Sequence, residues 1–226
     1  MYGERGCGVL QLAGLKRGYS NNAGLAFAYC GDHRLDYRII YIQGMQKHLA
    51  DMDIICKGVH GGPADDGRCY SPDTPLPTSF RDTVQSYNHS VADLSPYVHP
   101  YVVFGNSGST RYFDPQEFGI EPLSVMAVVC GDKLIYGIWG DQRDDSGDQA
   151  FIGEASLSLA MACYGDSMNI YNGHSDTDVL YIGFNGSDAL PGPDGAKWGA
   201  TSFEEFETSI EGIGDKLIER ISPRSP

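Results

Sequence analysis

The sequence predicts a single, mainly β domain with a few helices. Its 226 residues fall within the length that one β domain often reaches. The 29 Gly, 14 Tyr and 12 Pro suit a turn-rich β protein better than a helical bundle, and 41% hydrophobic residues are enough for a packed core. We expect three regions, which are an N-terminal extension packed on the core (1–34), the core itself (35–190), and a C-terminal loop with an amphipathic helix (191–226).

The expected strands are short runs rich in β-branched and aromatic residues. They cover 35–42 (LDYRIIYI), 101–104 (YVVF), 124–130 (SVMAVVC), 133–139 (KLIYGIW) and 179–184 (VLYIGF). Gly131 and Asp132 separate two of these runs by two residues, which is the spacing of a tight hairpin. We therefore predict that 124–139 forms an antiparallel pair.

Two helices are expected. Apolar residues of 153–164 (GEASLSLAMACY) fall on one helical face, which would place Glu154 in the first turn. Ser202, followed by Glu205, makes a capping box for a second helix near the C-terminus. The apolar stripe of that helix predicts a packing surface and consists of Phe203, Phe206, Ile210, Ile213 and Leu217.

The charge of the chain narrows the class of ligand. With 30 acidic and 16 basic residues the formal net charge is −14, so nucleic acids and anionic membranes are poor partners and a cationic substrate would be attracted. No run approaches the ~18 to 20 apolar residues of a membrane span, and the start MYGERGCGVL lacks a signal-peptide pattern. We expect neither a nucleic-acid nor a membrane partner.

Six cysteines are present, and none lies in a C-x-x-C pair, which argues against zinc and thioredoxin-type chemistry. Cys56 and Cys69 flank a Gly- and Asp-rich loop, so a bridge between them is the most plausible single pair. The segment 61–78, rich in Gly and Pro, is expected to be a long surface loop. Buried free thiols are the alternative, and the sequence leaves the other pairings open.

Several carboxylates gather in 136–156, between a predicted strand and a predicted helix. The spacing does not fit a calcium loop, because with Asp141 in the first position Ile152 stands where the bidentate Glu is required. A solvated acidic loop is the plain alternative. Against it, Trp139 and the small residues at the helix start place Asp141 and Glu154 where burial is expected.

Two carboxyl groups are what glycoside hydrolysis requires. One is protonated and delivers its proton to the leaving oxygen, and the other is ionised and activates water or attacks carbon. Burial raises the pKa of a carboxyl far more than a helix N-terminus lowers it, so a buried Glu154 can be the acid. The loop between Asp141 and Glu154 can fold back, so the sequence does not separate inversion from retention.

Four runs of the chain resemble the glycoside hydrolase family 75 endo-chitosanases. They are 51–58 (DMDIICKG), 125–148 (VMAVVCGDKLIYGIWGDQRDDSGD), 152–165 (IGEASLSLAMACYG) and 172–184 (NGHSDTDVLYIGF). With the shorter motifs at 101–104, 113–115 and 119–124, the resemblance covers roughly residues 35 to 186. It implies inverting hydrolysis of the β-1,4 links of chitosan, no metal or organic cofactor, and a fold similar to a double-psi β-barrel.

The resemblance also assigns roles. By motif, the essential aspartate and glutamate of the family fall on Asp141 and Glu154. This chain has Gln142 and Arg143, followed by extra acids, where relatives usually carry a Thr-Asn-Gly turn, so Asp145 is a rival for the aspartate role. We expect Glu154 to be the general acid and Asp141 or Asp145 to be the base.

The expected compartment and partners follow from the same resemblance. Relatives are secreted, so we expect an extracellular protein, with signal-peptide cleavage or release by lysis of a host cell accounting for the start of the chain. Chitosan is a polycation below neutral pH, and clustered carboxylates would concentrate it. We expect a monomer that binds chitosan or glucosamine oligomers.

Candidate substrate-binding residues lie in the resembling motifs or beside them. They are Asp51, Asp53 and Asp114, for ammonium groups, and Trp139 and Tyr136, for stacking on a sugar face. Turn or cap roles are the alternative for the three aspartates, and core positions are the alternative for the two rings.

Two rival functions stay open at this point. One is a glycosidase of the same design that acts on another amino-sugar polymer, such as partly acetylated chitin or peptidoglycan. The other is a polysaccharide-binding module that has lost catalysis. The presence of both Asp141 and Glu154 counts against the module, because binding alone does not need two carboxyls at those positions.

Overall fold

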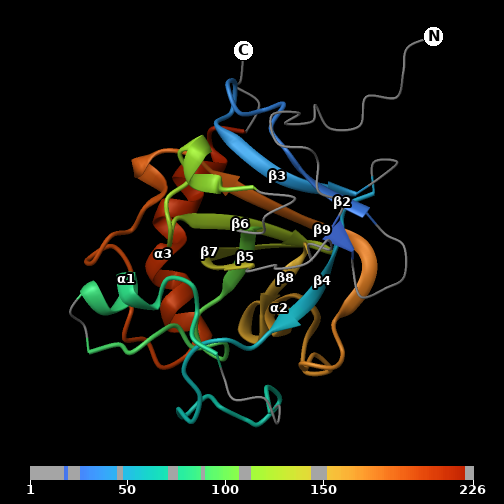
Figure 1. The fold of residues 1–226 in the computed structure, drawn as a ribbon. Helices are drawn as coiled ribbons and strands as arrows, with labels where there is room; N and C mark the ends of the chain where they lie inside the picture. Colours follow the sequence, from blue (N-terminus) through green and yellow to red (C-terminus); the bar gives the residue numbers. More distant parts are fainter. Residues whose placement is uncertain are drawn as a thin grey trace.

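The strands of this chain join into one mixed sheet, with helices against it (Figure 1). The computed structural model describes residues 18–19, 26–44, 48–70, 76–87, 90–106, 113–143 and 152–221. These residues contain nine strands and three α-helices. The prediction of a mainly β chain with a few helices is confirmed.

The strands are β1 (Gly18–Tyr19), β2 (Ala26–Cys30), β3 (Ile39–Gly44), β4 (Ala50–Ile55), β5 (Tyr101–Asn106), β6 (Val125–Cys130), β7 (Lys133–Arg143), β8 (Glu154–Ser156) and β9 (His174–Phe184). The α-helices are α1 (Arg81–Ser86), α2 (Leu157–Tyr164) and α3 (Phe203–Ile218), and the short 3-10 helices are η2 (Pro115–Phe118) and η3 (Ser187–Ala189).

The long strand β9 closes part of the sheet on itself. The strand order is β1-β2-β3-β9-β4-β8-β5-β7-β6, and β9 pairs with β6 as well. The six strands β9, β4, β8, β5, β7 and β6 are therefore paired in a closed cycle. Within it β4–β8 and β5–β7 are parallel and the other pairs are antiparallel.

The predicted hairpin is confirmed. β6 and β7 pair antiparallel up to Cys130 and Lys133, and Gly131 adopts a φ of 61° in the turn between them. Glycine takes this left-handed conformation without the steric cost that a side chain imposes. The local turn signal was sufficient here because the two strands are adjacent in the chain.

The strand predicted over 35–42 begins later, at Ile39. Leu35 is 86% exposed, and Arg38 has a φ of 59°, which no extended strand adopts. The side chain of Asp36 accepts hydrogen bonds from the backbone N–H of Tyr37 and from the His33 ring, which favours a turn before the strand. β3 then pairs with β2, a strand that the pattern of the first thirty residues did not indicate.

The helix predicted from Gly153 begins instead at Leu157, and its N-cap is Ser156, whose side chain accepts from the N–H of Leu159. Residues Glu154–Ser156 form β8, which pairs with β4 on one side and with β5 on the other. The prediction that Glu154 lies in a first helical turn was wrong. Pairing with two strands distant in sequence overrides the helical pattern at this position.

Helix α3 was predicted correctly, including its cap: the Ser202 side chain accepts from the N–H of Glu205. Figure 1 shows α3, in red, running along one side of the sheet, where it contacts β6 and β7. Gly214 weakens the helix but allows close packing, because a Cβ there would lie 2.4 Å from the ring of Tyr136. Phe206, Ile210 and Leu217 are buried in this contact layer.

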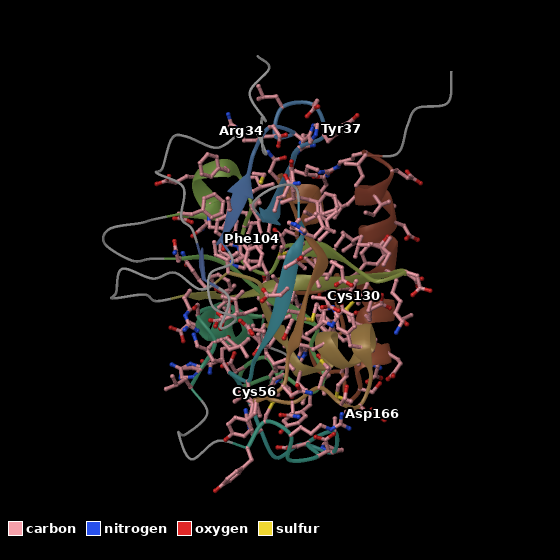
Figure 2. The ribbon with its side chains drawn as sticks, turned by 90° about the vertical axis from the view of Figure 1, so that its right-hand side faces the viewer. Arg34, Tyr37, Cys56, Phe104, Cys130 and Asp166 are labelled. Atoms are coloured by element: carbon pink, nitrogen blue, oxygen red, sulfur yellow. A yellow bond between two sulfur atoms is a disulfide. The ribbon has the colours of Figure 1, made fainter. Side chains whose placement is uncertain are left out.

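Disulfides fasten the loops. Cys56–Cys69 confirms the predicted pair, and Cys130–Cys163 joins the end of β6 to α2 (Figure 2). Cys30 is also disulfide-bonded, and none of the cysteines described is a free thiol. The described parts of the predicted loop, 61–70 and 76–78, contain no helix or strand, in agreement with the prediction.

Within the described residues, no helix combines the length and the apolar character that crossing a membrane requires.

Candidate active site

Strand β5 brings the two predicted catalytic residues to one level of the sheet. Val103 pairs with Asp141 of β7 on one side and with Glu154 of β8 on the other. Side chains of paired residues project from the same face, so both carboxyl groups lie on the face of Val103. Two strand spacings of about 4.8 Å place their backbones about 10 Å apart.

A third carboxylate joins them from β4. Asp53 pairs with Glu154 in the parallel β4–β8 ladder and is half-buried. Three strands thus present Asp53, Glu154 and Asp141 side by side, although the three positions are far apart in sequence.

A β-bulge in β7 turns Asp141 toward this face. Val102 pairs with Trp139, whereas Val103 pairs with Asp141. β7 therefore has one extra residue, Gly140, that has no partner on β5. A Cβ on Gly140 would lie 2.5 Å from the Cβ of Tyr101, so only glycine fits. Because of the bulge, Trp139 and Asp141 pair with residues on opposite faces of β5, contrary to the two-residue alternation of a regular strand.

Glu154 is a buried carboxyl group with an unusual proton affinity. Its exposed fraction is 8%, and Nη1 of Arg143 donates to Oε1 at 3.0 Å and to Oε2 at 3.3 Å. Burial raises the pKa of Glu154 to about 7, and the charges of Asp53 and Asp141 add to the increase. The positive charge of Arg143, and more weakly that of Lys57, lowers this pKa.

Asp141 is 0% exposed and is held by three contacts. Oδ1 accepts from the backbone N–H of Ser79 at 2.8 Å and from its hydroxyl at 2.6 Å, and Nζ of Lys57 lies 2.8 Å from Oδ2. Ser79 itself is exposed. The residue before it is anchored by a buried aspartate, since Asp93 accepts from the N–H and the hydroxyl of Thr78. The cation and hydroxyl that hold Asp141 come from loops whose sequences carry no recognisable signal for this role.

A cavity of about 190 Å³ opens beside Glu154. Asp53 and Glu154 form one side of it, and a turn that precedes β9 forms the other. The lining residues are Asp53, Ile54, Glu154, Ile170, Tyr171, Asn172, Gly173 and Ser175. Carboxylates and a concave surface therefore coincide, which is the usual arrangement of a substrate site.

The remaining predicted carboxylates lie elsewhere. Asp145 is outside the described residues. Asp51 is 1% exposed and lies against the backbone beside Gly153, so a substrate does not reach it in this conformation. Asp114 is the N-cap of η2 and accepts from the N–H of Gln116, which is the capping role given above as the alternative.

The two aromatic candidates are core residues, which corrects their assignment as rings that stack on a sugar. Trp139 is 0% exposed, and its ring meets the ring of Phe80 edge to face. Tyr136 is 5% exposed, and its hydroxyl donates to Asp215 of α3. Both rings pack against other elements of the protein. The alternating apolar residues of β7 therefore indicate burial of these side chains in the core and not contact with a sugar.

In the part of the chain that the structure describes, no cluster of three or more His, Cys, Asp and Glu side chains is arranged to hold a metal ion.

Comparison with known proteins identifies the family. A family model described as fungal chitosanase of glycosyl hydrolase group 75 matches residues 52–220, a range that extends past the recognised motifs and includes α3. Endo-chitosanase B of Aspergillus oryzae is 42% identical over 210 residues, which cover 90% of this chain and 82% of the relative. The endo-chitosanase of Aspergillus fumigatus is 42% identical over 209 residues with the same coverage. The chain belongs to the fungal chitosanase family, group 75 of the glycosyl hydrolases.

Proposed function

We propose that this chain is an endo-chitosanase in which Glu154 is the general acid. The observation that carries the proposal is a buried Glu154 with a pKa of about 7 that opens onto a cavity. A general acid works best when its pKa is near the working pH, so that it is protonated and still a competent donor. Such a group suits a polymer whose amines are charged under mildly acidic conditions.

The reaction is a single displacement. Glu154 donates its proton to the glycosidic oxygen as the C1–O bond breaks, and water attacks C1 from the opposite face. A second carboxylate accepts the proton of that water. The resemblance to an inverting family supports this course. So does the placement of Asp141 and Glu154 on two strands with β5 between them, because inverting enzymes hold their carboxyls about 6.5 to 9.5 Å apart to leave room for the water.

Asp141 is the first candidate for the base. Its Oδ1 accepts from the hydroxyl of the exposed Ser79, and the proposal requires this hydroxyl to move aside so that water reaches the buried carboxylate. Asp145 is the rival and is decided by the experiment below. Asp53, which borders the cavity, is the carboxylate that we assign to the ammonium group of a bound sugar.

We extend the proposal to fold and compartment. The closed cycle of six strands, with two parallel pairs among antiparallel ones, supports a β-barrel, of the double-psi type that the resemblance implies. The disulfides Cys56–Cys69 and Cys130–Cys163 support action in an oxidising, extracellular setting. We propose a monomer whose partner is chitosan, with neither nucleic acid nor membrane among its ligands, in keeping with a net charge of −14.

The test is release of reducing ends and the sizes of products from fully deacetylated chitosan at mildly acidic pH. Wild type is compared with Glu154→Gln, Asp141→Asn and Asp145→Asn, each checked for folding by circular dichroism. Short oligomers from wild type and none from Glu154→Gln are expected, and the aspartate variant that is also inactive identifies the base. NMR of the first products reports their anomeric form, and a retained β-anomer contradicts single displacement.

Two further substrates test the rivals. Faster hydrolysis of partly acetylated chitin or peptidoglycan than of chitosan would assign another polymer. Binding of chitosan by wild type without any release of ends would make the chain a binding module and overturn the proposal.

A further inference from the structure

We propose that Tyr171 and Tyr70 form an aromatic platform that binds a glucosamine unit next to the bond that is hydrolysed. The inference rests on the proposed function and adds a subsite to it. Tyr171 lines the cavity that contains Glu154, yet its side chain is 78% exposed, and Tyr70 is 74% exposed. Tyr171 is therefore an open aromatic ring at the edge of a concave polar site, which is where a sugar ring could be bound.

The two tyrosines belong to neighbouring loops. The hydroxyl of Tyr171 donates to the backbone carbonyl of Tyr70 at 3.4 Å. The same two loops are joined by the N–H of Ile170, which donates to the carbonyl of Arg68, and by Nη1 of Arg68, which donates to the carbonyl of Asp166. These hydrogen bonds hold the two loops next to each other.

Tyr171 projects from a turn that is held by its own hydrogen bonds. Asn169 and Asn172 exchange backbone hydrogen bonds of 3.2 and 2.9 Å, and the Asn169 side chain accepts from the N–H of Tyr171 at 2.9 Å. The Asn172 side chain donates to the carbonyl of Ser167. A preorganised turn loses little freedom when a ligand binds, so its exposed ring can contribute fully to affinity.

Gly173 brings this turn against β4, the strand that carries Asp53. A Cβ at Gly173 would lie 2.4 Å from the carbonyl oxygen of Met52 and 3.3 Å from Cα of Asp53. Only glycine permits that approach, and it places Tyr171 on the rim of the cavity that Asp53 and Glu154 border.

Tyr70 is fixed by its neighbour in the chain. Cys69 forms a disulfide with Cys56, which directly follows β4. The backbone N–H of Cys69 also donates to the hydroxyl of Tyr97. The N–H of Tyr70 donates to the carbonyl of Gly67. The disulfide therefore attaches the second half of the platform to the end of the strand that carries Asp53.

A glucosamine unit suits this surface on two counts. Its ring presents axial C–H groups that pack on a tyrosine face, and its ammonium group is attracted by the ring quadrupole and by a nearby carboxylate such as Asp53. Trp139 and Tyr136 cannot supply this contact because both are buried.

The test compares kinetics on glucosamine oligomers of increasing length and on polymeric chitosan. Tyr171→Ala is expected to raise KM for a long oligomer about fivefold to tenfold, the loss typical of one aromatic contact, with kcat nearly unchanged. Tyr171→Phe keeps the ring face and is expected to restore the KM of wild type. Tyr70→Ala, on the other loop, tests the same platform independently of how Tyr171→Ala folds.

Tyr37→Ala is the matched control. Tyr37 is 38% exposed and lies at the opposite end of the molecule from Cys56 (Figure 2). Its substitution is expected to leave KM unchanged. A binding measurement that needs no turnover accompanies the kinetics: calorimetry with the long oligomer is expected to give a Kd about fivefold to tenfold higher for Glu154→Gln/Tyr171→Ala than for Glu154→Gln.

The outcomes separate the two proposals. An inactive wild type contradicts the proposed function. An active wild type whose KM and Kd are unaffected by both alanine substitutions overturns the platform while the function stands. A fall in kcat at constant KM also overturns it, because a binding platform acts on affinity.

Discussion

Replacing Glu154 by Gln is expected to change how the stability of the protein depends on pH, in addition to abolishing hydrolysis. Burial raises the pKa of Glu154 from 4.5 to about 7. Between these values the folded protein keeps a proton that the unfolded chain has lost, so the contribution of this group to stability falls as pH rises through the window. Each pKa unit corresponds to about 1.4 kcal/mol. The free energy of unfolding is therefore expected to be about 3 kcal/mol lower at about pH 8 than at about pH 4 because of Glu154 alone.

Glutamine has a similar shape and does not titrate, so Glu154→Gln escapes this cost. Urea unfolding of both proteins at about pH 4 and about pH 8 measures it. The stability of the variant minus that of wild type is expected to be about 3 kcal/mol larger at the higher pH. Glu121→Gln, which changes an exposed glutamate, is the control and is expected to show no such change. An equal difference at both pH values for Glu154→Gln would refute the reasoning.

Three further predictions follow from named contacts. Arg143 donates to both oxygens of Glu154 and lowers its pKa, so Arg143→Gln is expected to move the alkaline limb of the kcat profile to higher pH; a shift to lower pH would contradict the assignment. Burial lowers the pKa of His99 from 6.5 to about 4. As pH falls through that window, the free energy of unfolding of the wild type is expected to lose up to about 3 kcal/mol from this group. Urea unfolding of His99→Gln should show a smaller loss over the same window. The disulfide Cys130–Cys163 closes a separation of 33 residues, so replacing both cysteines by serine is expected to cost about 3 to 4 kcal/mol in urea unfolding, and an unchanged midpoint would show that it adds nothing.

The effects of His99 and Glu154 have opposite signs over overlapping pH ranges. His99 is buried neutral, with Nδ1 accepting from the N–H of Ser95 and Nε2 donating to the carbonyl of Trp198. Lower pH therefore removes stability at His99 and restores it at Glu154. Because these two contributions oppose each other in the wild type, single variants are needed to resolve each group.

Features that depend on neighbouring residues were readable from the sequence. The Gly131 turn, the Ser202 cap of α3 and the bridge between Cys56 and Cys69 each involve a short stretch of chain with one dominant solution. The family motifs named Asp141 and Glu154, and the structure places both on one face of the sheet.

Features that depend on pairing between distant segments were decided by the tertiary structure. The apolar spacing after Gly153 fits a helix, but Glu154 becomes a strand residue because β4 and β5 offer hydrogen-bond partners on both sides. Asp141 reaches the face of Glu154 because of a bulge at Gly140, which the apolar pattern of β7 does not indicate. Local pattern carries no information about either partner strand.

By itself, then, the sequence determined the mainly β composition, the acidic charge that suits a cationic polymer, and the local turns and caps, and its resemblance to a family predicted Asp141 and Glu154 as the catalytic pair. Only the tertiary structure brought Asp53 and Arg143 to Glu154, enclosed that carboxyl so that its pKa rises, and set Tyr171 on the rim of the cavity. The physical reason is that proton affinity and substrate contact depend on burial and on charges within a few ångströms, and strand pairing between distant segments sets both.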